Sequence, residues 1–372
     1  MYYCVLICYS VFLLYFAIIS GFIIGFLRLK TFVPEKKNTV KDLKLSVLIP
    51  FKNEEKNLPI IFENLKKQTL NQEFFEVLFI DDRSTDRSVF LLKDLIKNTA
   101  NFKLISTGEN KSGKKDALKA GIEYSNNKLI VLTDADCFHS ENRLETIYFY
   151  YLEYKPKMII APVLMTGMSF FQKLQAVEFL SLTASTAGAA GINHPIMCNG
   201  ANSAFEKAVF YEFKDALHTN EISGDDVFLL HNIKKKYPKG IHYLKSNDAT
   251  VFTEAETSLQ SFIRQRLRWT SKSKSYRDFD TVFVSVIVFL TNILLSGALV
   301  SLFFKPDAYV FVISLFLIKT IPDFILILTA GNFFKQKKTL ISLLILSVIY
   351  PFYVVFIGFS GIFTKNIKWK QD

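Results

Sequence analysis

The stretch Leu45-Ser-Val-Leu-Ile-Pro50 decides the fold, together with the apolar run Phe75–Ile80 and the polar segment Asp81-Asp82-Arg-Ser-Thr-Asp86 that follows it. Both apolar runs are short and are bounded by turn residues, which is typical of buried strands. Between them, Glu54–Gln68 has the length and the apolar spacing of a helix. This part of the chain therefore predicts a strand, a helix and a second strand in succession.

The same alternation continues to about Pro162. A helix from about Asp86, a candidate N-cap, to Lys97 comes next. We then predict strands at Phe102–Ser106, Leu129–Thr133 and Met158–Pro162, and helices near Lys114–Tyr124 and Asn142–Tyr154. Such alternation is typical of a mostly parallel sheet covered by helices on both faces. Ligands of these sheets bind beyond the carboxyl ends of the strands.

The 372 residues carry their apolar and their charged side chains in different parts of the chain. Half of them are hydrophobic and 21% are charged, and the charge lies between about Arg28 and Asp280. This segregation excludes an ordinary cytosolic enzyme, a disordered chain and a collagen-like repeat. Many Lys and Arg lie beside apolar segments, so anionic lipid is a simpler partner for the net charge of +11 than nucleic acid. The four cysteines have neither paired nor metal-ligand spacing, so we expect no disulfide framework and no zinc site.

The N-terminal segment Tyr2–Leu27 contains no charged side chain and, as a helix, is long enough to cross a hydrocarbon core of roughly 30 Å. A signal peptide is the alternative, but no basic segment precedes the run and the run is too long. We therefore expect an uncleaved transmembrane anchor over residues 1–27. Basic residues follow it closely, so the positive-inside rule places the next domain in the cytoplasm. They are Arg28, Lys30, Lys36, Lys37, Lys41 and Lys44.

Three further hydrophobic segments form a C-terminal membrane region, residues 281–372. They are Thr281–Phe304, Ala308–Leu328 and Leu340–Phe363. The second contains Lys319 and Asp323, which are costly in lipid unless the charges pair or face protein or water. Three full crossings would place the basic C-terminal tail outside, against the positive-inside rule. The alternatives are a tail that violates the rule and one segment that does not cross.

Two acidic motifs stand at the ends of predicted strands. Asp81-Asp82 follows the second strand, and Asp134-Ala-Asp136 follows the fourth. Irregular backbone at a strand end can let both carboxylates of an Asp-x-Asp approach one divalent cation, and all-oxygen ligation suits Mg²⁺ or Mn²⁺. Asp is also an ordinary turn residue, so this motif alone is weak. Gly113-Lys114 is weak by itself as well, and it lacks the spacing of a P-loop.

Two more motifs follow in the second half of the chain. Gly224-Asp225-Asp226 precedes the apolar helix Val227–His231. Adjacent carboxylates in a partly desolvated site raise the pKa of one of them, which suits a general base, but an N-cap and a first-turn acid are the simpler interpretation. Gln265-Arg-Leu-Arg268-Trp269 lies in a basic, amphipathic stretch, and a helix on an anionic membrane surface would explain that stretch too.

Seven motifs thus occur in one order along the chain. They are Ser46-Val-Leu-Ile-Pro50-Phe-Lys-Asn53-Glu54, Asp81–Asp86, Gly113-Lys114 with Ala117-Leu118, Asp134-Ala-Asp136, Asn199-Gly200-Ala-Asn202, Gly224-Asp225-Asp226 and Gln265-x-x-Arg268-Trp269. This order resembles membrane-embedded family 2 glycosyltransferases, the group that contains cellulose, chitin and hyaluronan synthases and ceramide glucosyltransferases. The resemblance covers roughly residues 44–270 and the terminal helices. It implies an α/β fold of the GT-A type, Rossmann-like and mostly parallel, over residues 28–280, with amphipathic interface helices near the end of that domain.

The resemblance also implies which residues bind the donor and the metal. A nucleotide-sugar donor would contact Pro50, Glu54, Asp82, Lys114, Asp134 and Arg268. A divalent cation, Mg²⁺ or Mn²⁺, would bind Asp136 and Asp134, with Asp136 as the preferred direct ligand.

The resemblance assigns the catalytic and acceptor residues in the same way. The catalytic carboxylates would be Asp226, as the general base, and Asp225, which replaces the usual Glu. That departure leaves open which of the two is the base, and Lys119 is a second departure, because many relatives have Asn there. The acceptor would contact Asn199, Gly200, Asn202, Gln265 and Trp269.

The implied activity is an inverting transfer of a sugar, by preference from a UDP-sugar, to a membrane-associated lipid or saccharide in cell-envelope polysaccharide or glycolipid synthesis. The alternatives are a processive polysaccharide synthase of the hyaluronan, chitin or poly-N-acetylglucosamine type and a catalytically inactive membrane scaffold. Four candidate spans are few for a translocation pore, which favours a non-processive transferase. We expect an integral protein of the inner or plasma membrane that binds no nucleic acid, and the sequence names no protein partner.

The charge that follows Leu27 predicts that residues 44–280 lie in the cytoplasm, where nucleotide sugars are made. A reporter fused after residue 40 should therefore give a cytoplasmic signal. A periplasmic or luminal signal would overturn both the topology and the donor assignment. A second fusion at Asp372 decides whether all three C-terminal segments cross.

Overall fold

The computed structural model describes residues 2–35, 43–108, 112–213, 225–336 and 342–364. The chain forms two compact units. The first unit comprises Met1–Leu29, Met165–Ile196 and Ala255–Ile367, and the second comprises Lys30–Leu164, Met197–Glu254 and Lys368–Asp372. The sequence predicts domain boundaries after residues 27 and 280 instead, and those boundaries stay a prediction.

The second unit is an α/β domain. In the described part of the chain its main sheet has seven strands in the order β3-β2-β1-β4-β8-β6-β9. These strands are β1 (Leu45–Phe51), β2 (Phe75–Asp81), β3 (Phe102–Ser106), β4 (Leu129–Leu132), β6 (Met158–Ile160), β8 (Ser203–Glu206) and β9 (Ile241–Tyr243). Strand β8 runs antiparallel to both of its neighbours, and the other pairings are parallel. The predicted α/β class with a mostly parallel sheet is therefore confirmed.

Helices connect these strands and cover the sheet. They are α2 (Leu58–Lys66), α3 (Ser88–Leu95), α4 (Lys114–Tyr124), α5 (Arg143–Tyr154), α7 (Lys207–Glu212) and α8 (Asp225–Lys236). Every residue of β1 and β2 is buried, as expected of strands with packed layers on both faces. A smaller sheet has the order β5-β10-β7, with β5 at Cys137–His139, β10 at Val251–Glu254 and β7 at Val163–Thr166.

Two helices begin later than the sequence predicts. Helix α2 starts at Leu58 rather than near Glu54, because residues 52–57 form turns and a proline stands in its first turn. Helix α3 starts at Ser88, and its N-cap is Arg87 rather than Asp86. The Asp86 side chain nevertheless accepts a hydrogen bond from the Ser88 amide at 3.0 Å, so it satisfies a donor of the first helical turn.

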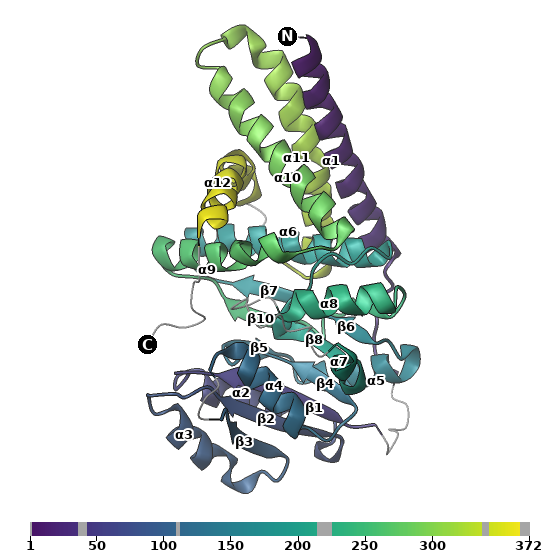
Figure 1. Ribbon diagram of the computed structural model, residues 1–372, viewed down its shortest axis with the longest axis vertical. Helices are drawn as coiled ribbons and strands as arrows, with labels where there is room; N and C mark the ends of the chain where they lie inside the picture. The colour runs from purple at the N-terminus through teal and green to yellow at the C-terminus, as the bar shows by residue number, and fades with distance from the viewer. Residues whose placement is uncertain (1, 36–42, 109–111, 214–224, 337–341, 365–372) are drawn as a thin grey trace. The chain divides into compact units, whose positions relative to one another are not determined.

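The first unit consists mainly of helices. They are α1 (Tyr2–Arg28), α6 (Phe170–Gly191), α9 (Leu259–Ser271), α10 (Phe279–Ser301), α11 (Tyr309–Phe333) and α12 (Leu343–Phe363). Helices α1, α10 and α11 lie side by side, and α6 and α9 run across their direction (Figure 1). Helix α6 packs against α1, and α9 packs against α12.

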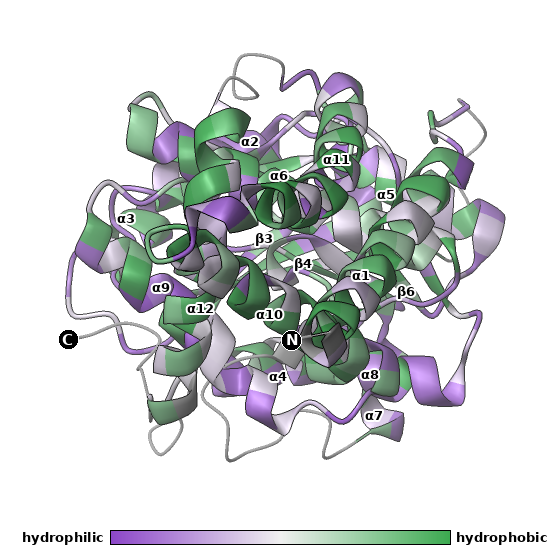
Figure 2. Cartoon of the chain, turned by 90° about the horizontal axis from the view of Figure 1, so that it is seen from above, coloured by the Kyte–Doolittle hydropathy of each residue, from purple (hydrophilic) through white to green (hydrophobic). Residues whose placement is uncertain are grey.

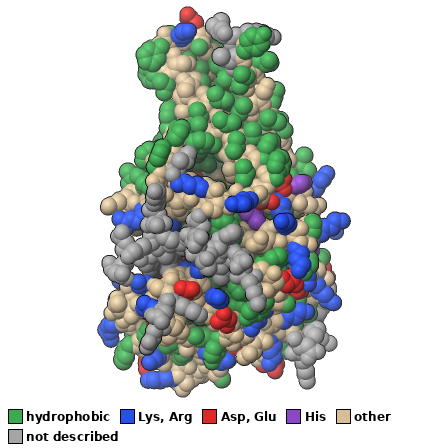
Figure 3. Space-filling view, viewed as in Figure 1, with side chains coloured by type: hydrophobic (Ala, Val, Ile, Leu, Met, Phe, Trp, Pro, Cys, Tyr) green, Lys and Arg blue, Asp and Glu red, His purple; other side chains and the backbone are tan. Residues whose placement is uncertain are grey.

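Within the described residues, four helices are long and apolar enough to cross a membrane: Val5–Arg28, Phe279–Ser301, Pro306–Phe333 and Leu343–Gly361. Hydrophobic residues extend along much of each of these helices (Figure 2). Many of them are exposed on the unit's surface (Figure 3), for example Phe303, Leu344 and Phe356. Exposing so large an apolar surface to water is energetically unfavourable, so these helices are consistent with a membrane protein.

The charges within α11 are paired. Lys319 Nζ lies 2.7 Å from Asp323 Oδ2, one helical turn away. Tyr15 of α1 donates its hydroxyl to the other carboxylate oxygen at 2.6 Å. The Lys319 side chain is only 3% exposed, and its ammonium lies 5.2 Å from the centre of the Tyr350 ring on α12. These contacts supply the partners that charges within an apolar helix require.

Helices α1 and α6 cross at glycines. An added Cβ at Gly25 would lie 2.0 Å from the Gly188 carbonyl oxygen, and one at Gly188 would lie 2.3 Å from the Phe22 carbonyl oxygen. A Cβ at Gly191 would meet the Gly25 carbonyl oxygen at 2.2 Å. The two backbones are therefore in direct contact, which only residues without a side chain permit.

We expect Gly188→Ala to separate the two helices and to cost about 1–3 kcal/mol, as overpacking does. Gly297 on α10 is the matched control, because an added Cβ there meets nothing within 4 Å. Ala favours a helix over Gly by about 1 kcal/mol, so Gly297→Ala should keep or raise the unfolding temperature while Gly188→Ala lowers it. Thermal unfolding in detergent, followed by tryptophan fluorescence, measures both. A similar change in the two variants would contradict this explanation.

Candidate active site

The acidic motif after β4 is held in a turn. The Cys137 amide donates to the Asp134 carbonyl at 3.3 Å, which reverses the chain before β5 begins. The Asp134 side chain is about one-third exposed and Asp136 is exposed. Lys114, the first residue of α4, places its Nζ 2.5 Å from Asp134 Oδ1. Two predicted site residues from separate elements therefore meet at the carboxyl end of β4.

Asp82 joins the end of β2 to the start of α4. Its two carboxylate oxygens both accept the Gly113 amide at 2.9 Å. Gly113 has φ 103°, a backbone conformation that favours glycine, and it directly precedes Lys114. Burial raises the pKa of the Asp82 carboxyl above its ordinary value, and the Gly113 amide offsets part of that rise. Asp82 is 2% exposed, so this bond is protected from water.

The loop that follows β1 is tied to the loop that follows β2. Asn53 has φ 54° and accepts the Thr85 amide on its side-chain oxygen at 2.8 Å, while its own amide donates to Ser84 Oγ at 3.0 Å. The Glu54 amide donates to Ser88 Oγ at 2.8 Å. The predicted residue Glu54 is therefore held against the segment after Asp82, and Pro50 lies near the end of β1, opposite Ile80 of β2. Sequence reasoning assigned Asn53 no role, although an Asn in the turn that follows a strand is a common left-handed residue.

Asp226 contacts the loop that carries Asn199 and Gly200. Its Oδ2 accepts the Gly200 amide at 2.8 Å, and its Oδ1 accepts the Val227 amide at 2.9 Å. Asn199 accepts the Ala201 amide at 2.9 Å and so shapes the same loop. Helix α8 spans Asp225–Lys236, so it includes the acidic pair and is longer than the predicted helix Val227–His231. The side chain of Asp225 lies outside the described residues.

Asn202 is wholly buried and binds backbone. Its amide nitrogen donates to the carbonyls of Pro162 and Ala249 at 2.7 Å, and its oxygen accepts Arg143 Nε at 3.1 Å. Arg143 also donates to the Leu132 carbonyl at 3.0 Å, at the end of β4. Burial lowers the pKa of Arg143 to about 10, so it stays charged near neutral pH. Sequence reasoning did not find Arg143, because a basic residue at a helix start is ordinarily solvated.

Gln265, Arg268 and Trp269 lie on α9, in the first unit. Gln265 donates to Glu256 Oε1 at 2.9 Å. The Trp269 ring lies 5.9 Å from that of Phe179 on α6, centre to centre. Arg268 and Trp269 are both half-buried.

The residues after β4 fit a divalent cation by their chemistry. Carboxylate oxygens are the ligands that Mg²⁺ and Mn²⁺ prefer, and Asp134 and Asp136 supply them within one turn. Among the described residues, no three His, Cys, Asp or Glu side chains gather as a metal site. Two carboxylates leave most of the six positions of such an ion to other oxygens, which a diphosphate could supply.

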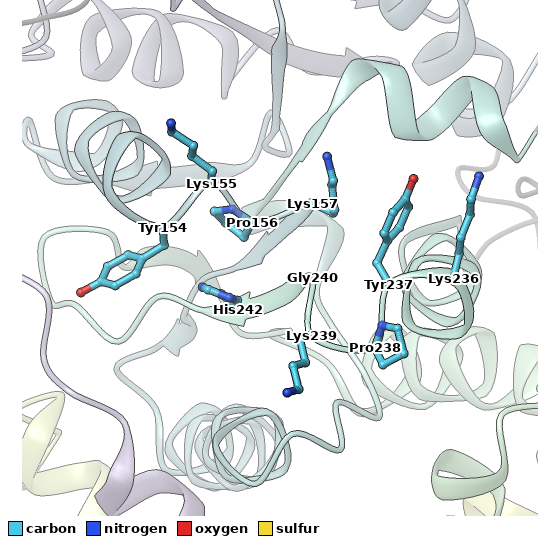
Figure 4. A pocket seen from close by; sticks show the side chains of 10 residues that line it. All are labelled: Tyr154, Lys155, Pro156, Lys157, Lys236, Tyr237, Pro238, Lys239, Gly240 and His242. Atoms are coloured by element: carbon cyan, nitrogen blue, oxygen red, sulfur yellow. The ribbon is translucent and has the colours of Figure 1, made fainter.

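A pocket of about 530 Å³ lies elsewhere in the second unit (Figure 4). It is lined at the starts of β6 and β9 by Tyr154, Lys155, Pro156, Lys157, Lys236, Tyr237, Pro238, Lys239, Gly240 and His242. Strands β6 and β9 are parallel to each other and to β4, since β8 is antiparallel to both β4 and β6. The pocket therefore lies at the amino-terminal ends of the strands, whereas the acidic motifs lie at the carboxyl ends. None of the predicted site residues lines the pocket.

Comparison with known proteins agrees with the fold and with the resemblance to glycosyltransferases. Residues 46–213 match the profile of the family described as glycosyl transferase family 2. The chain is similar to the putative glycosyltransferase CsbB of Bacillus subtilis, with 36% identity over 96 residues, 26% of this chain and 29% of the relative. A longer match, 24% identical, covers 70% of this chain and 84% of a dolichyl N-acetyl-α-D-glucosaminyl phosphate 3-β-D-2,3-diacetamido-2,3-dideoxy-β-D-glucuronosyltransferase of Methanococcus voltae. The first three curated relatives match over 29% to 39% of their own length.

A solved structure extends the comparison to the fold. A mannosyltransferase from Pyrobaculum calidifontis, in complex with GDP-Man and Mn²⁺, superposes with a TM-score of 0.50 at 13% identity. The superposition covers 92% of this chain and 95% of that one. Over residues 46–213 the sequence is thus similar to glycosyl transferase family 2, and its α/β domain has a fold of the GT-A type.

Proposed function

We propose that the protein transfers a sugar from a nucleotide-sugar donor to a membrane-associated lipid or saccharide acceptor, with inversion at the anomeric carbon. The observation that carries this proposal is the chain of contacts from Asp82 through Gly113 and Lys114 to Asp134. It joins three loops at the carboxyl edge of a parallel sheet, where ligands of such sheets bind. The family match supports the same reaction class.

The donor would bind along this edge. The loop with Pro50 and Glu54, together with Asp82, would hold the nucleoside, and Lys114 would lie near the base or the phosphates. Asp136 and Asp134 would hold Mg²⁺ or Mn²⁺, which would offset negative charge on the diphosphate. The Pyrobaculum relative contains GDP-Man and Mn²⁺, which supports a nucleotide sugar and a divalent cation here without naming the base.

Asp226 would act as the general base. It removes the proton from an acceptor hydroxyl while that oxygen attacks the anomeric carbon, and the bond to the diphosphate breaks on the opposite face. Its contact with the Gly200 amide supports this role, because the same loop carries the predicted acceptor residue Asn199. Arg268 would offset charge on the leaving diphosphate, and Trp269 would stack on the acceptor.

A lipid acceptor fits the four apolar helices. The Methanococcus relative is named for a dolichyl-linked substrate, and we extend that class of acceptor to this chain. The catalytic domain would face the cytoplasm, on the charge that follows α1. A processive polysaccharide synthase is the second candidate, favoured by the Gln-x-x-Arg-Trp sequence, and product length separates the two. A single added sugar supports our proposal, and a polymer supports the alternative.

A donor screen tests the proposed reaction. Purified protein with Mn²⁺ or Mg²⁺ is offered UDP-, GDP- and dTDP-sugars, and release of nucleoside diphosphate is measured. We expect Asp136→Ala, or excess chelator, to lower turnover at least about 10²-fold, roughly 3 kcal/mol, because charge on the leaving group is no longer offset. Asp94→Ala is the control, because that carboxylate on α3 is 68% exposed and pairs with nearby Lys97. Full activity of the wild type in chelator would refute the metal assignment.

The base is tested by comparing the two adjacent acids. Asp226→Asn keeps the size of the side chain but cannot accept a proton, so kcat should fall about 10²–10⁴-fold. The affinity for the nucleotide, measured by calorimetry, should stay unchanged, because other residues would contact the donor. If Asp226→Asn is active and Asp225→Asn is not, Asp225 is the base. If both variants keep the wild-type rate, the assigned mechanism is wrong.

A further inference from the structure

Helix α9 carries a second arginine between the motif residues Gln265 and Arg268. This residue, Arg266, is 3% exposed and faces the interior of the first unit. Its Nε lies 3.1 Å from Glu178 Oε2 on α6, and its Nη2 lies 2.6 Å from the same oxygen. Glu178 is 6% exposed, so both charges of this pair are removed from water.

A third helix contributes to the pair. Tyr353 on α12 donates its hydroxyl to Glu178 Oε1 at 3.0 Å, and its ring stacks on Phe262 of α9 at 5.6 Å between centres. Arg266 Nη1 also donates to the side-chain oxygen of Gln265. The carboxylate of Glu178 therefore connects α6, α9 and α12 at one point.

The same guanidinium lies against the motif tryptophan. Arg266 Cζ is 4.4 Å from the centre of the Trp269 ring, one helical turn further along α9. Phe179, the neighbour of Glu178 in the sequence, also contacts Trp269, with 5.9 Å between the two ring centres. A planar guanidinium that both pairs with a carboxylate and stacks on an aromatic ring restricts that ring more than a lysine could.

We propose that Arg266, held by Glu178 and Tyr353, is a positioning residue that sets the orientation of Trp269 and thereby the use of the acceptor. A buried ion pair adds little net stability, because desolvation offsets much of its attraction. Its main effect here is geometric, since the paired atoms fix the rotation of α9 relative to α6 and α12. The effect on the acceptor rests on the proposed function, whereas the effect on Trp269 does not.

The experiment uses the full-length protein carrying Trp369→Phe, so that Trp269 is its single tryptophan. Arg266→Lys keeps the charge but loses the planar stack, and Glu178→Gln removes the partner charge. Each should shift the Trp269 emission to longer wavelength and increase its quenching by acrylamide about twofold. Arg264→Lys is the control, because Arg264 is exposed on the same helix. Unchanged Trp269 emission in both test variants would overturn the proposal, whether or not any donor is turned over.

Kinetics separate positioning from loss of folded protein. Both variants should raise the acceptor KM about tenfold, while the donor KM and the rate of donor hydrolysis change less than twofold. Equal losses of hydrolysis and transfer would overturn the proposal in favour of a merely structural role. If the wild type turns over no donor, the proposed function fails, and the fluorescence result alone decides the positioning of Trp269.

A double variant separates stability from orientation. Glu178→Gln/Arg266→Gln leaves no unpaired buried charge, so its unfolding temperature should recover relative to that of Glu178→Gln. It still lacks the guanidinium over Trp269, so the acceptor KM should stay raised. Recovery of both the unfolding temperature and the KM would contradict a role for Arg266 beyond stability.

Discussion

The candidate site depends on the bond between the Asp82 carboxylate and the Gly113 amide. Asp82 stands where β2 ends, and Gly113 stands where α4 begins, so this bond determines where the helix starts relative to the sheet. Burial makes the ionised carboxylate costly, and a backbone donor shared by both oxygens offsets part of that cost. Because Lys114 follows directly, the same bond brings its ammonium to Asp134 at the end of β4.

The first unit uses buried charge in a comparable way. Glu178 of α6 pairs with Arg266 of α9, and Lys319 pairs with Asp323 along the apolar helix α11. Removing one partner of such a pair leaves an uncompensated charge, which costs about 3–5 kcal/mol, whereas the intact pair adds little net stability. The Glu178–Arg266 pair therefore specifies how α9 meets α6, and Asp323 of the second pair also joins α11 to α1 through the Tyr15 hydroxyl. The glycine contact between α1 and α6 has the same consequence, because only one alignment lets the backbones touch.

Much of the fold could be predicted from local pattern. The predicted strand Phe102–Ser106 and the predicted helix Lys114–Tyr124 have the same bounds in the structure. Helix α2 differs because apolar spacing does not reveal a turn, and Asn53 holds that turn in a left-handed conformation through contacts with the next loop. Asn202, a predicted acceptor residue, is buried and donates to two backbone carbonyls, and the motif alone does not indicate this burial.

The sequence by itself determined the alternation of strands and helices, the four apolar segments and an order of motifs that resembles family 2 glycosyltransferases. Each of these features depends on residues close together in the chain, so hydrophobic periodicity and turn residues are enough to recognise it. Only the tertiary structure decided that Asp82 holds the start of α4, that Asp226 meets Gly200, and that Arg266 is buried against Glu178. Such contacts join residues far apart in sequence, and their strength comes from shared burial, which no local pattern records.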